Sequence, residues 1–339
     1  MKNISNFLIP NFNFELSEKD KKEIKKDLWL WITKKITRKK FRKKSVVGVS
    51  FDDILSKIRL SISENKPIKL VFLFWWYKHF WSDSHQKANW AEFFNILFLI
   101  DLLKPVLTIY KPWVIFDYAS EDVIITKMNN YPKESLELYA ESFKELLEYF
   151  WKYFPENFEM NYVRTWEKYN RNELFQKIDE KLENCIKEFK SAKPEEIENR
   201  LKRSYRSVMF NWEKDYSDLN EEDKKDLIIK SKCVEDLFYE VEDWFIWEYY
   251  YWNENIPLVW SWWLSDENID NWLTLWSTYS SSVDFWIWKG VFEIRGEKII
   301  PRVLSKNQYF EVKNNLETIK LDFDFKNKNF DEVEILKTM

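Results

Sequence analysis

Short apolar runs alternate with longer amphipathic segments along the chain, and this order predicts an α/β fold. Residues 67–74 form a largely apolar run after a proline, and residues 114–118 form a second one, as is typical of buried parallel strands. Apolar residues recur with helical spacing in 50–64, 90–107 and 135–154. Because strands and helices follow one another in this way, we expect a Rossmann-like parallel sheet with flanking helices.

The pattern changes in the second half of the chain. Residues 172–230 are highly charged and predict helices, whereas the last hundred residues carry short apolar runs that predict a β-rich extension. One of these runs continues through Arg295-Gly296-Glu297 into the next, which predicts a hairpin over 291–303. The predicted organisation is a basic helical arm (1–45), a Rossmann-like core (46–170), a charged helical segment (171–235) and a β-rich part that completes the core (236–339).

Composition excludes several protein classes. With 45% hydrophobic and 32% charged residues, the chain has enough apolar surface to fold. Its longest apolar stretch, 93–107, is interrupted by polar residues, so no membrane span is expected. The N-terminus has no signal-peptide pattern. Two cysteines, Cys185 and Cys233, are too few for a disulfide scaffold and favour a cytoplasmic location.

The balance of glycine and tryptophan is abnormal. The chain has 3 Gly and 20 Trp, whereas average usage would give roughly 24 glycines. Some bacteria read the codon UGA as glycine, so a translation that reads it as tryptophan would produce this imbalance. Trp90, Trp166 and Trp286 have contexts that suit a real tryptophan. The positions that best suit a disguised glycine are Trp75, Trp76, Trp113, Trp260, Trp262 and Trp263.

Candidate chemistry follows the predicted strands. Tyr77-Lys78 comes after the first strand, and Ser120 and Asp122 come after the second. In open α/β sheets, ligands bind outside the carboxyl ends of the strands. We therefore expect Lys78 and Asp122 to be catalytic, with Tyr77 and Ser120 contacting substrate. Lys78 could pair with a phosphate or carboxylate, or form a Schiff base; the alternative is an exposed loop lysine.

Later in the chain, four residues are candidates for binding substrate or its phosphate group. Arg203 and Arg206 share one side of a predicted helix and could hold an anion; the alternative, which the nearby glutamates favour, is that they form surface ion pairs. Lys289 lies in a predicted turn that could present backbone N–H groups to a phosphate, with Asp284 close before it.

Metal and nucleotide motifs are missing from the sequence. His79 and His85 are the only histidines, and with Asp83 they match no standard zinc spacing. There is no P-loop motif, even when every Trp is read as Gly, and a serine nucleophile in the C-terminal half would have no histidine partner. We therefore expect no metal and no cofactor.

A basic run lies near the N-terminus. Lys19 to Lys44 contains 13 Lys/Arg and 3 acidic residues, which can indicate an RNA-binding surface or simply a solvated helix face. The net charge of −4 over the whole chain indicates no nucleic-acid partner.

The stretch from Pro67 to Tyr139 resembles the isocyanide (isonitrile) synthase family, which includes the dityrosine and pyoverdine biosynthesis proteins. The resemblance rests on a Pro-Ile strand that ends in an aromatic-Lys pair, an Ala-Glu helix start, a Tyr-x-Pro turn with a strand and serine after it, and a later Ile-Pro-Leu strand. In this chain these are Pro67-Ile68, Tyr77-Lys78, Ala91-Glu92, Tyr110-Lys111-Pro112, Val114–Tyr118, Ser120 and Ile256-Pro257-Leu258.

The resemblance implies a Rossmann-like fold and a reaction that condenses the amine of an amino acid with a ketose phosphate to give an isocyanide. It implies that Lys78 activates the carbonyl and that Arg203, Arg206 and Lys289 pair with phosphate. The expected partners are thus an amino acid and a sugar phosphate. Two alternatives stay open: a non-enzymatic ligand-binding protein with exposed Trp, and an RNA-associated protein that uses the basic run.

Overall fold

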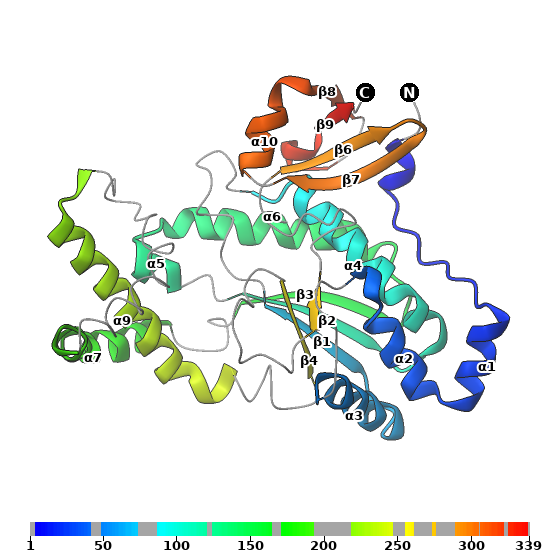
Figure 1. Ribbon diagram of the computed structural model, residues 1–339, viewed down its shortest axis with the longest axis horizontal. Helices are drawn as coiled ribbons and strands as arrows, with labels where there is room; N and C mark the ends of the chain where they lie inside the picture. The colour runs from blue at the N-terminus through cyan, green and yellow to red at the C-terminus, as the bar shows by residue number, and fades with distance from the viewer. Residues whose placement is uncertain are drawn as a thin grey trace.

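The computed structural model describes most of the chain as one α/β body with a second sheet above the first (Figure 1). The described residues are 4–41, 49–73, 87–120, 124–164, 171–192, 218–246, 255–260, 273–275, 289–304, 306–321 and 325–337.

The main sheet has five parallel strands in the order β3-β2-β1-β4-β5. They are β1 (Ile68–Leu73), β2 (Val114–Ser120), β3 (Phe158–Arg164), β4 (Asn255–Trp260) and β5 (Leu273–Leu275). This is the strand order of a doubly wound Rossmann-like sheet. The predicted fold class, with its C-terminal β-rich extension, is confirmed.

Helices connect and cover these strands. Figure 1 shows α4 (Trp90–Ile109) and α6 (Lys133–Trp151) above the main sheet, with α3 (Val49–Ser63) below it. The short helix α5 (Ile124–Asn129) lies between β2 and α6. On the face below α4 and α6, Phe72, Phe116 and Tyr118 are buried with their rings in contact. The burial of these large aromatic side chains supplies much of the driving force that holds the layers together.

The segment before α3 packs against the core. It contains η1 (Ile4–Phe7), α1 (Glu18–Lys26), α2 (Leu28–Ile36) and η2 (Lys39–Phe41). Trp31, Ile32 and Ile36 on α2 are buried in the central hydrophobic cluster, together with Phe41. Most described lysines of the basic run lie on the outer side of these elements and are exposed, namely Lys19, Lys21, Lys22, Lys25, Lys26, Lys34, Lys39 and Lys40.

Helix α4 contains Pro105, which would normally disrupt a helix. A proline has no N–H group, so the carbonyl oxygen four residues earlier, on Asp101, loses its usual donor. The Arg38 guanidinium, from the end of α2, donates to the carbonyl oxygens of Asp101 and Leu102 at 2.8 Å each. Burial lowers the pKa of Arg38 to about 10, and the charge of Asp101 opposes this shift. Arg38 thus replaces the hydrogen bond that Pro105 removes.

The connection from β3 to β4 is a long helical one. Helix α7 (Arg171–Ser191) follows β3, and α9 (Glu221–Ile246) precedes β4. The two helices pack against each other, and α5 packs against α9 (Figure 1). Lys127 of α5 also pairs with Asp179 of α7 at 2.6 Å. The described helices of this charged region therefore form part of the crossover from β3, at one edge of the main sheet, to β4 on the far side of β1.

The second sheet has the order β7-β6-β9-β8. Its strands are β6 (Lys289–Arg295), β7 (Lys298–Leu304), β8 (Leu316–Lys320) and β9 (Glu332–Lys337), with α10 (Lys306–Val312), η7 (Lys313–Asn315) and η8 (Lys328–Phe330) between them. The β6–β7 hairpin confirms the one expected from the sequence, and Gly296 in its turn has φ +56°, which favours glycine.

The second sheet docks onto the start of α4. A Cβ atom on Gly290 would lie 2.3 Å from the carbonyl carbon of Trp90 and 2.5 Å from the nitrogen of Ala91, so only glycine fits there. Trp90 Nε1 donates to the carbonyl oxygen of Glu332 at 2.7 Å, and Asn327 Nδ2 donates to that of Ala88 at 2.9 Å. These contacts fix the chain where it enters α4.

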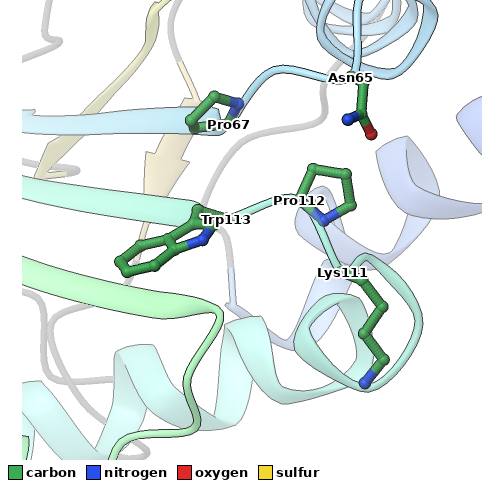
Figure 2. Close-up of a pocket in the computed structure, with 5 residues that line it drawn as sticks. All are labelled: Asn65, Pro67, Lys111, Pro112 and Trp113. Atoms are coloured by element: carbon green, nitrogen blue, oxygen red, sulfur yellow. The ribbon is translucent and has the colours of Figure 1, made fainter.

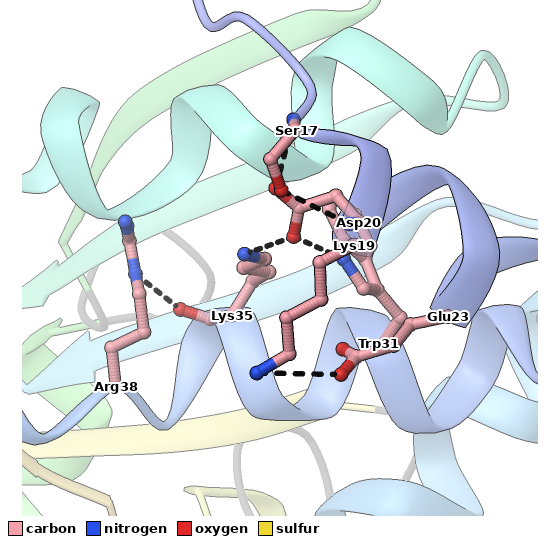
Figure 3. A network of polar contacts seen from close by, with 7 residues as sticks. All are labelled: Ser17, Lys19, Asp20, Glu23, Trp31, Lys35 and Arg38. Atoms are coloured by element: carbon pink, nitrogen blue, oxygen red, sulfur yellow. Dashed lines mark hydrogen bonds and ion pairs between the residues drawn. The ribbon is translucent and has the colours of Figure 1, made fainter.

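A buried polar network joins α1 to α2 (Figure 3). Asp20 Oδ1 accepts a hydrogen bond from Trp31 Nε1 at 3.0 Å and pairs with Lys35 Nζ at 2.6 Å, while Asp20 Oδ2 accepts from Ser17 Oγ at 2.7 Å. Burial raises the pKa of Asp20, but the hydrogen bonds from Lys35, Trp31 and Ser17 outweigh it and hold this pKa well below its ordinary value of 3.8.

We expect Asp20→Asn to lower the free energy of unfolding at neutral pH by about 2 kcal/mol, because hydrogen bonds to a charged group are lost. A depressed pKa in the folded state contributes stability above the unfolded pKa, and this stability is lost as the pH falls through the folded pKa. Urea unfolding at about pH 7 and about pH 3 should therefore show a smaller difference between the two proteins at the lower pH. An equal difference at both pH values would contradict this account.

Among the described residues, no helix is both long and apolar enough to cross a membrane.

Candidate functional site

The strand order predicts a ligand-binding crevice outside the carboxyl ends of β1 and β4. From β1 the chain moves to β2 and β3 on one side, and later to β4 and β5 on the other side. In open parallel sheets, a ligand binds outside the carboxyl ends of the strands at such a reversal. Leu73, Ser120, Arg164 and Trp260 end the four longer strands, so they mark the edge where we place the candidate site.

Ser120 and Arg164 are neighbours at this edge. They are paired in the register of β2 and β3, and both are buried. Residues paired in this way point to the same face of a parallel sheet, so the hydroxyl and the guanidinium lie on one side. Ser120 was expected to contact substrate, and the structure places it at the carboxyl edge of the sheet. Arg164 was not anticipated from the sequence.

Arg164 is held by a carboxylate from the helix above it. Its Nη1 donates to Glu137 Oε2 at 2.6 Å and its Nη2 donates to Glu137 Oε1 at 3.3 Å, so the contact is bidentate. The Arg164 side chain is 3% exposed and that of Glu137 is 34% exposed. A guanidinium stays charged in proteins, so this edge contains a buried positive charge whose carboxylate partner is partly open to solvent.

A second polar layer lies deeper on the same face. Glu92 at the start of α4 is fully buried and accepts hydrogen bonds from the Asn89 backbone N–H at 2.8 Å and from the Tyr139 hydroxyl at 3.0 Å. The Tyr118 hydroxyl donates to Asn95 Oδ1 at 2.9 Å. Burial, and secondly the charge of Glu92, raises the pKa of Tyr118 and Tyr139 well above the ordinary value. Both hydroxyls therefore stay protonated and act as hydrogen-bond donors.

The Glu92 network holds the helices that support the Arg164–Glu137 pair. Glu92 closes the capping box of α4 with Asn89, which fixes the first turn of the helix. The Tyr139 hydroxyl ties α6 to the same carboxylate. Because both helices are held at the carboxyl end of the sheet, the Arg164–Glu137 pair has a rigid support, which is what a binding site requires of its surroundings.

Most of the sequence-predicted site residues lie outside the described part of the chain. These are Tyr77, Lys78, Asp122, Arg203, Arg206 and Asp284, together with the possible ligands His79, Asp83 and His85. Their roles stay predictions. Over the residues that the structure does describe, no group of three or more His, Cys, Asp or Glu could hold a metal ion.

Lys289 lies at the start of β6, beside the Gly290 contact with α4. Its ammonium group is 3.4 Å from Glu334 Oε2 and 5.6 Å from the centre of the Tyr309 ring. The Tyr309 hydroxyl donates to Glu334 Oε1 at 3.0 Å. Successive residues of a strand point to opposite faces, so Lys289 points away from α4, toward α10. In this arrangement the charge of Glu334 offsets that of Lys289.

A shallow pocket lies at the other edge of the main sheet (Figure 2). It has a volume of about 420 Å³ and is lined by Asn65, Pro67, Lys111, Pro112 and Trp113. Pro67 and Trp113 directly precede β1 and β2, so this is the amino edge, opposite the candidate site. The Lys111 side chain points away from the other four residues (Figure 2). The pocket offers an exposed indole, but no group suited to acid–base chemistry faces into it.

Comparison with known proteins supports the fold. The crystal structure of PvcA from Pseudomonas aeruginosa matches this chain with a TM-score of 0.55 and 12% sequence identity, over 90% of this chain and 99% of that chain. No family model matches the chain, and no curated protein matches its sequence. The likeness to PvcA shows a shared fold over nearly the whole length of both chains.

Proposed function

We propose that this protein is a small-molecule biosynthetic enzyme, similar to isocyanide synthases, whose substrates bind at the carboxyl edge of the main sheet. The observation that carries the proposal is the buried Arg164 with its partly exposed partner Glu137, beside Ser120. They lie at the carboxyl edge of the main sheet, on the β2–β3 side of the reversal between β1 and β4. The likeness in fold to PvcA and the motifs around Tyr77-Lys78 agree with it.

The proposed reaction condenses the amine of an amino acid with the carbonyl of a ketose phosphate. Lys78 is the proposed carbonyl-activating group, with Asp122 as its catalytic partner and Tyr77 and Ser120 in contact with substrate. Charged donors that would suit the phosphate are Arg203, Arg206 and Lys289, with Asp284 nearby. Arg164 acts as a positioning residue in this proposal, because its guanidinium already binds Glu137 in a bidentate manner.

Incubation of the purified chain with an amino acid and a ketose phosphate labelled with carbon-13 tests the reaction. We expect a labelled isonitrile carbon in the NMR spectrum of the product, and no such signal with Lys78→Ala. Trp113→Ala is the matched control, because Trp113 lies at the opposite edge of the sheet. If a panel of amino acids and ketose phosphates gives neither product nor saturable binding, the proposed function is wrong.

A second candidate is a non-enzymatic ligand-binding protein. The indole of Trp113 is 45% exposed and lines the pocket at the amino edge, as expected for an aromatic binding surface. If this candidate is correct, Trp113→Ala abolishes ligand binding and Lys78→Ala leaves it unchanged, which is the reverse of the result expected for the enzyme.

We also propose that the source organism inserts glycine at several of the tryptophan positions. The proposal rests on the 3 Gly and 20 Trp of the sequence. Of the six best candidates, the backbone is described only at Trp113 and Trp260, and neither has a positive φ. Peptide sequencing by mass spectrometry of the protein from its natural source decides the question. Tryptophan at all six positions would exclude the proposal.

A further inference from the structure

The two cysteines of the chain, 48 positions apart in the sequence, lie together in the fold. Cys185 is on α7 and Cys233 is on α9. Cys233 is fully buried in a small apolar cluster with Phe189 and Ile229, and Cys185 packs against the same cluster. The two cysteines therefore contact one small cluster from helices that pack against each other. Nothing in the sequence around either cysteine indicates that they lie together.

Ion pairs on both sides of the thiols hold the two helices in register. Lys181 pairs with Glu240 at 2.5 Å, and Lys190 pairs with Asp226 at 2.7 Å. Lys181 precedes Cys185 while Glu240 follows Cys233, and the second pair has the reverse order, so the helices run antiparallel with the cysteines between the ion pairs. In this register, Cys185 and Cys233 occupy facing positions along the two helices.

The surroundings of the two thiols differ. Burial raises the pKa of both, and more strongly for Cys233, so both are protonated at neutral pH. Cys185 is only partly buried. Because an oxidant must reach the sulfur, the more exposed Cys185 is the residue that is oxidised first, and Cys233 is the resolving thiol inside the cluster. The thiolate is the reactive form, so the raised pKa of Cys185 makes this oxidation slow at neutral pH and faster at alkaline pH.

We propose that Cys185 and Cys233 form an oxidisable dithiol site that closes into an intramolecular disulfide between α7 and α9. The Cys185 sulfur attacks one oxygen of hydrogen peroxide, the O–O bond breaks, and a sulfenic acid and one water are formed. The Cys233 sulfur then attacks the sulfenic sulfur, the S–O bond breaks, and a second water leaves. Two thiols are oxidised to one disulfide and one peroxide is reduced to two waters.

The position of this site gives the disulfide a structural consequence. Helices α7 and α9 belong to the crossover that begins at the carboxyl end of β3, directly after Arg164, and returns to β4. A covalent bond between them closes a long loop of the chain and restricts the opening of the helix pair. The same bond would be reversed by a thiol reductant, as disulfides are by exchange.

The test treats the reduced full-length protein with hydrogen peroxide and follows intact mass and reaction with maleimide. We expect the mass to fall by two hydrogens, both thiols to become unreactive in one step, and dithiothreitol to restore them. The Tm of the oxidised protein should rise by about 5 °C. Uptake of oxygen on separate cysteines, disulfide-linked dimers, or thiols that stay reduced while Tm is unchanged would overturn the proposal.

Cys185→Ser is the first control, because it removes the accessible thiol and leaves the cluster around Cys233 in place. Its Tm should not change with peroxide. Cys233→Ala is the second, and in this variant Cys185 should stop at the sulfenic acid, which a dimedone probe detects. If Cys185→Ser shows the same peroxide-dependent rise in Tm as the wild type, the stabilisation does not come from this disulfide. None of these readouts depends on the proposed enzymatic activity.

Discussion

Replacing Trp31 with glycine is expected to lower the free energy of unfolding by about 4–6 kcal/mol. Trp31 is 1% exposed, and its indole N–H donates to Asp20 in the network that joins α1 to α2. Truncating a buried Trp typically costs about 3–5 kcal/mol, and glycine inside a helix adds about 1 kcal/mol relative to alanine. Equilibrium urea unfolding, followed by circular dichroism, measures the difference.

Trp113→Gly is the matched control for this experiment. Trp113 is 45% exposed and lies outside the regular elements, directly before β2, so its removal should change the free energy of unfolding by less than about 1 kcal/mol. Equal effects at the two positions would contradict the packing described for α2. The comparison also bears on the genetic code of the source, because a site that tolerates glycine could be glycine in nature, whereas Trp31 fills a place in the core.

The elements of the main sheet could be predicted because their apolar patterns are local. Residues 67–74 and 114–118 are short apolar runs bounded by Pro67 and Pro112, and the helices between them have apolar residues at helical spacing. The structure places β1 and β2 there, with α4 between them. The β6–β7 hairpin could also be predicted from the sequence, because Gly296 stands between two apolar runs.

Strand β3 is harder to recognise from its apolar pattern. Its residues Phe158–Arg164 alternate between buried and half-buried positions, but glutamate, asparagine and arginine interrupt the apolar signal. Arg164 occupies the last buried position of this alternation, where an apolar residue is usual. The signal in the sequence was a charged residue at a position where the strand's alternation requires a buried side chain. Only the pairing of Arg164 with Glu137 in the structure identifies this residue as a candidate for a functional position.

Contacts between distant segments could not be predicted from the sequence. Nothing local indicates that Arg38 serves Pro105, that Gly290 must clear the backbone of Trp90, or that Cys185 meets Cys233. Each depends on the docking of separate elements, and side-chain pairing across such distances is decided by tertiary packing rather than by local propensity.

The Arg164–Glu137 pair should respond unequally to the loss of either partner. We expect Glu137→Ala to lower the free energy of unfolding by about 3 kcal/mol, and Arg164→Met by only about 1–2 kcal/mol. Removing Glu137 takes the bidentate carboxylate away from a guanidinium that is 3% exposed and stays charged. Removing Arg164 leaves a carboxylate that is 34% exposed and can be hydrated, while methionine fills the space.

Chemical unfolding of both variants and of Glu137→Gln measures these effects, and the glutamine variant separates charge from shape. If the pair only supports the fold, the stability differences appear while KM and kcat of the proposed reaction are unchanged. If Arg164 positions the groups at the carboxyl edge, Arg164→Met lowers kcat by about 10²-fold or more, as the misplacement of reacting groups does, although it is the less destabilising change. An Arg164→Met protein less stable than Glu137→Ala would contradict the burial and charge described for this edge of the sheet.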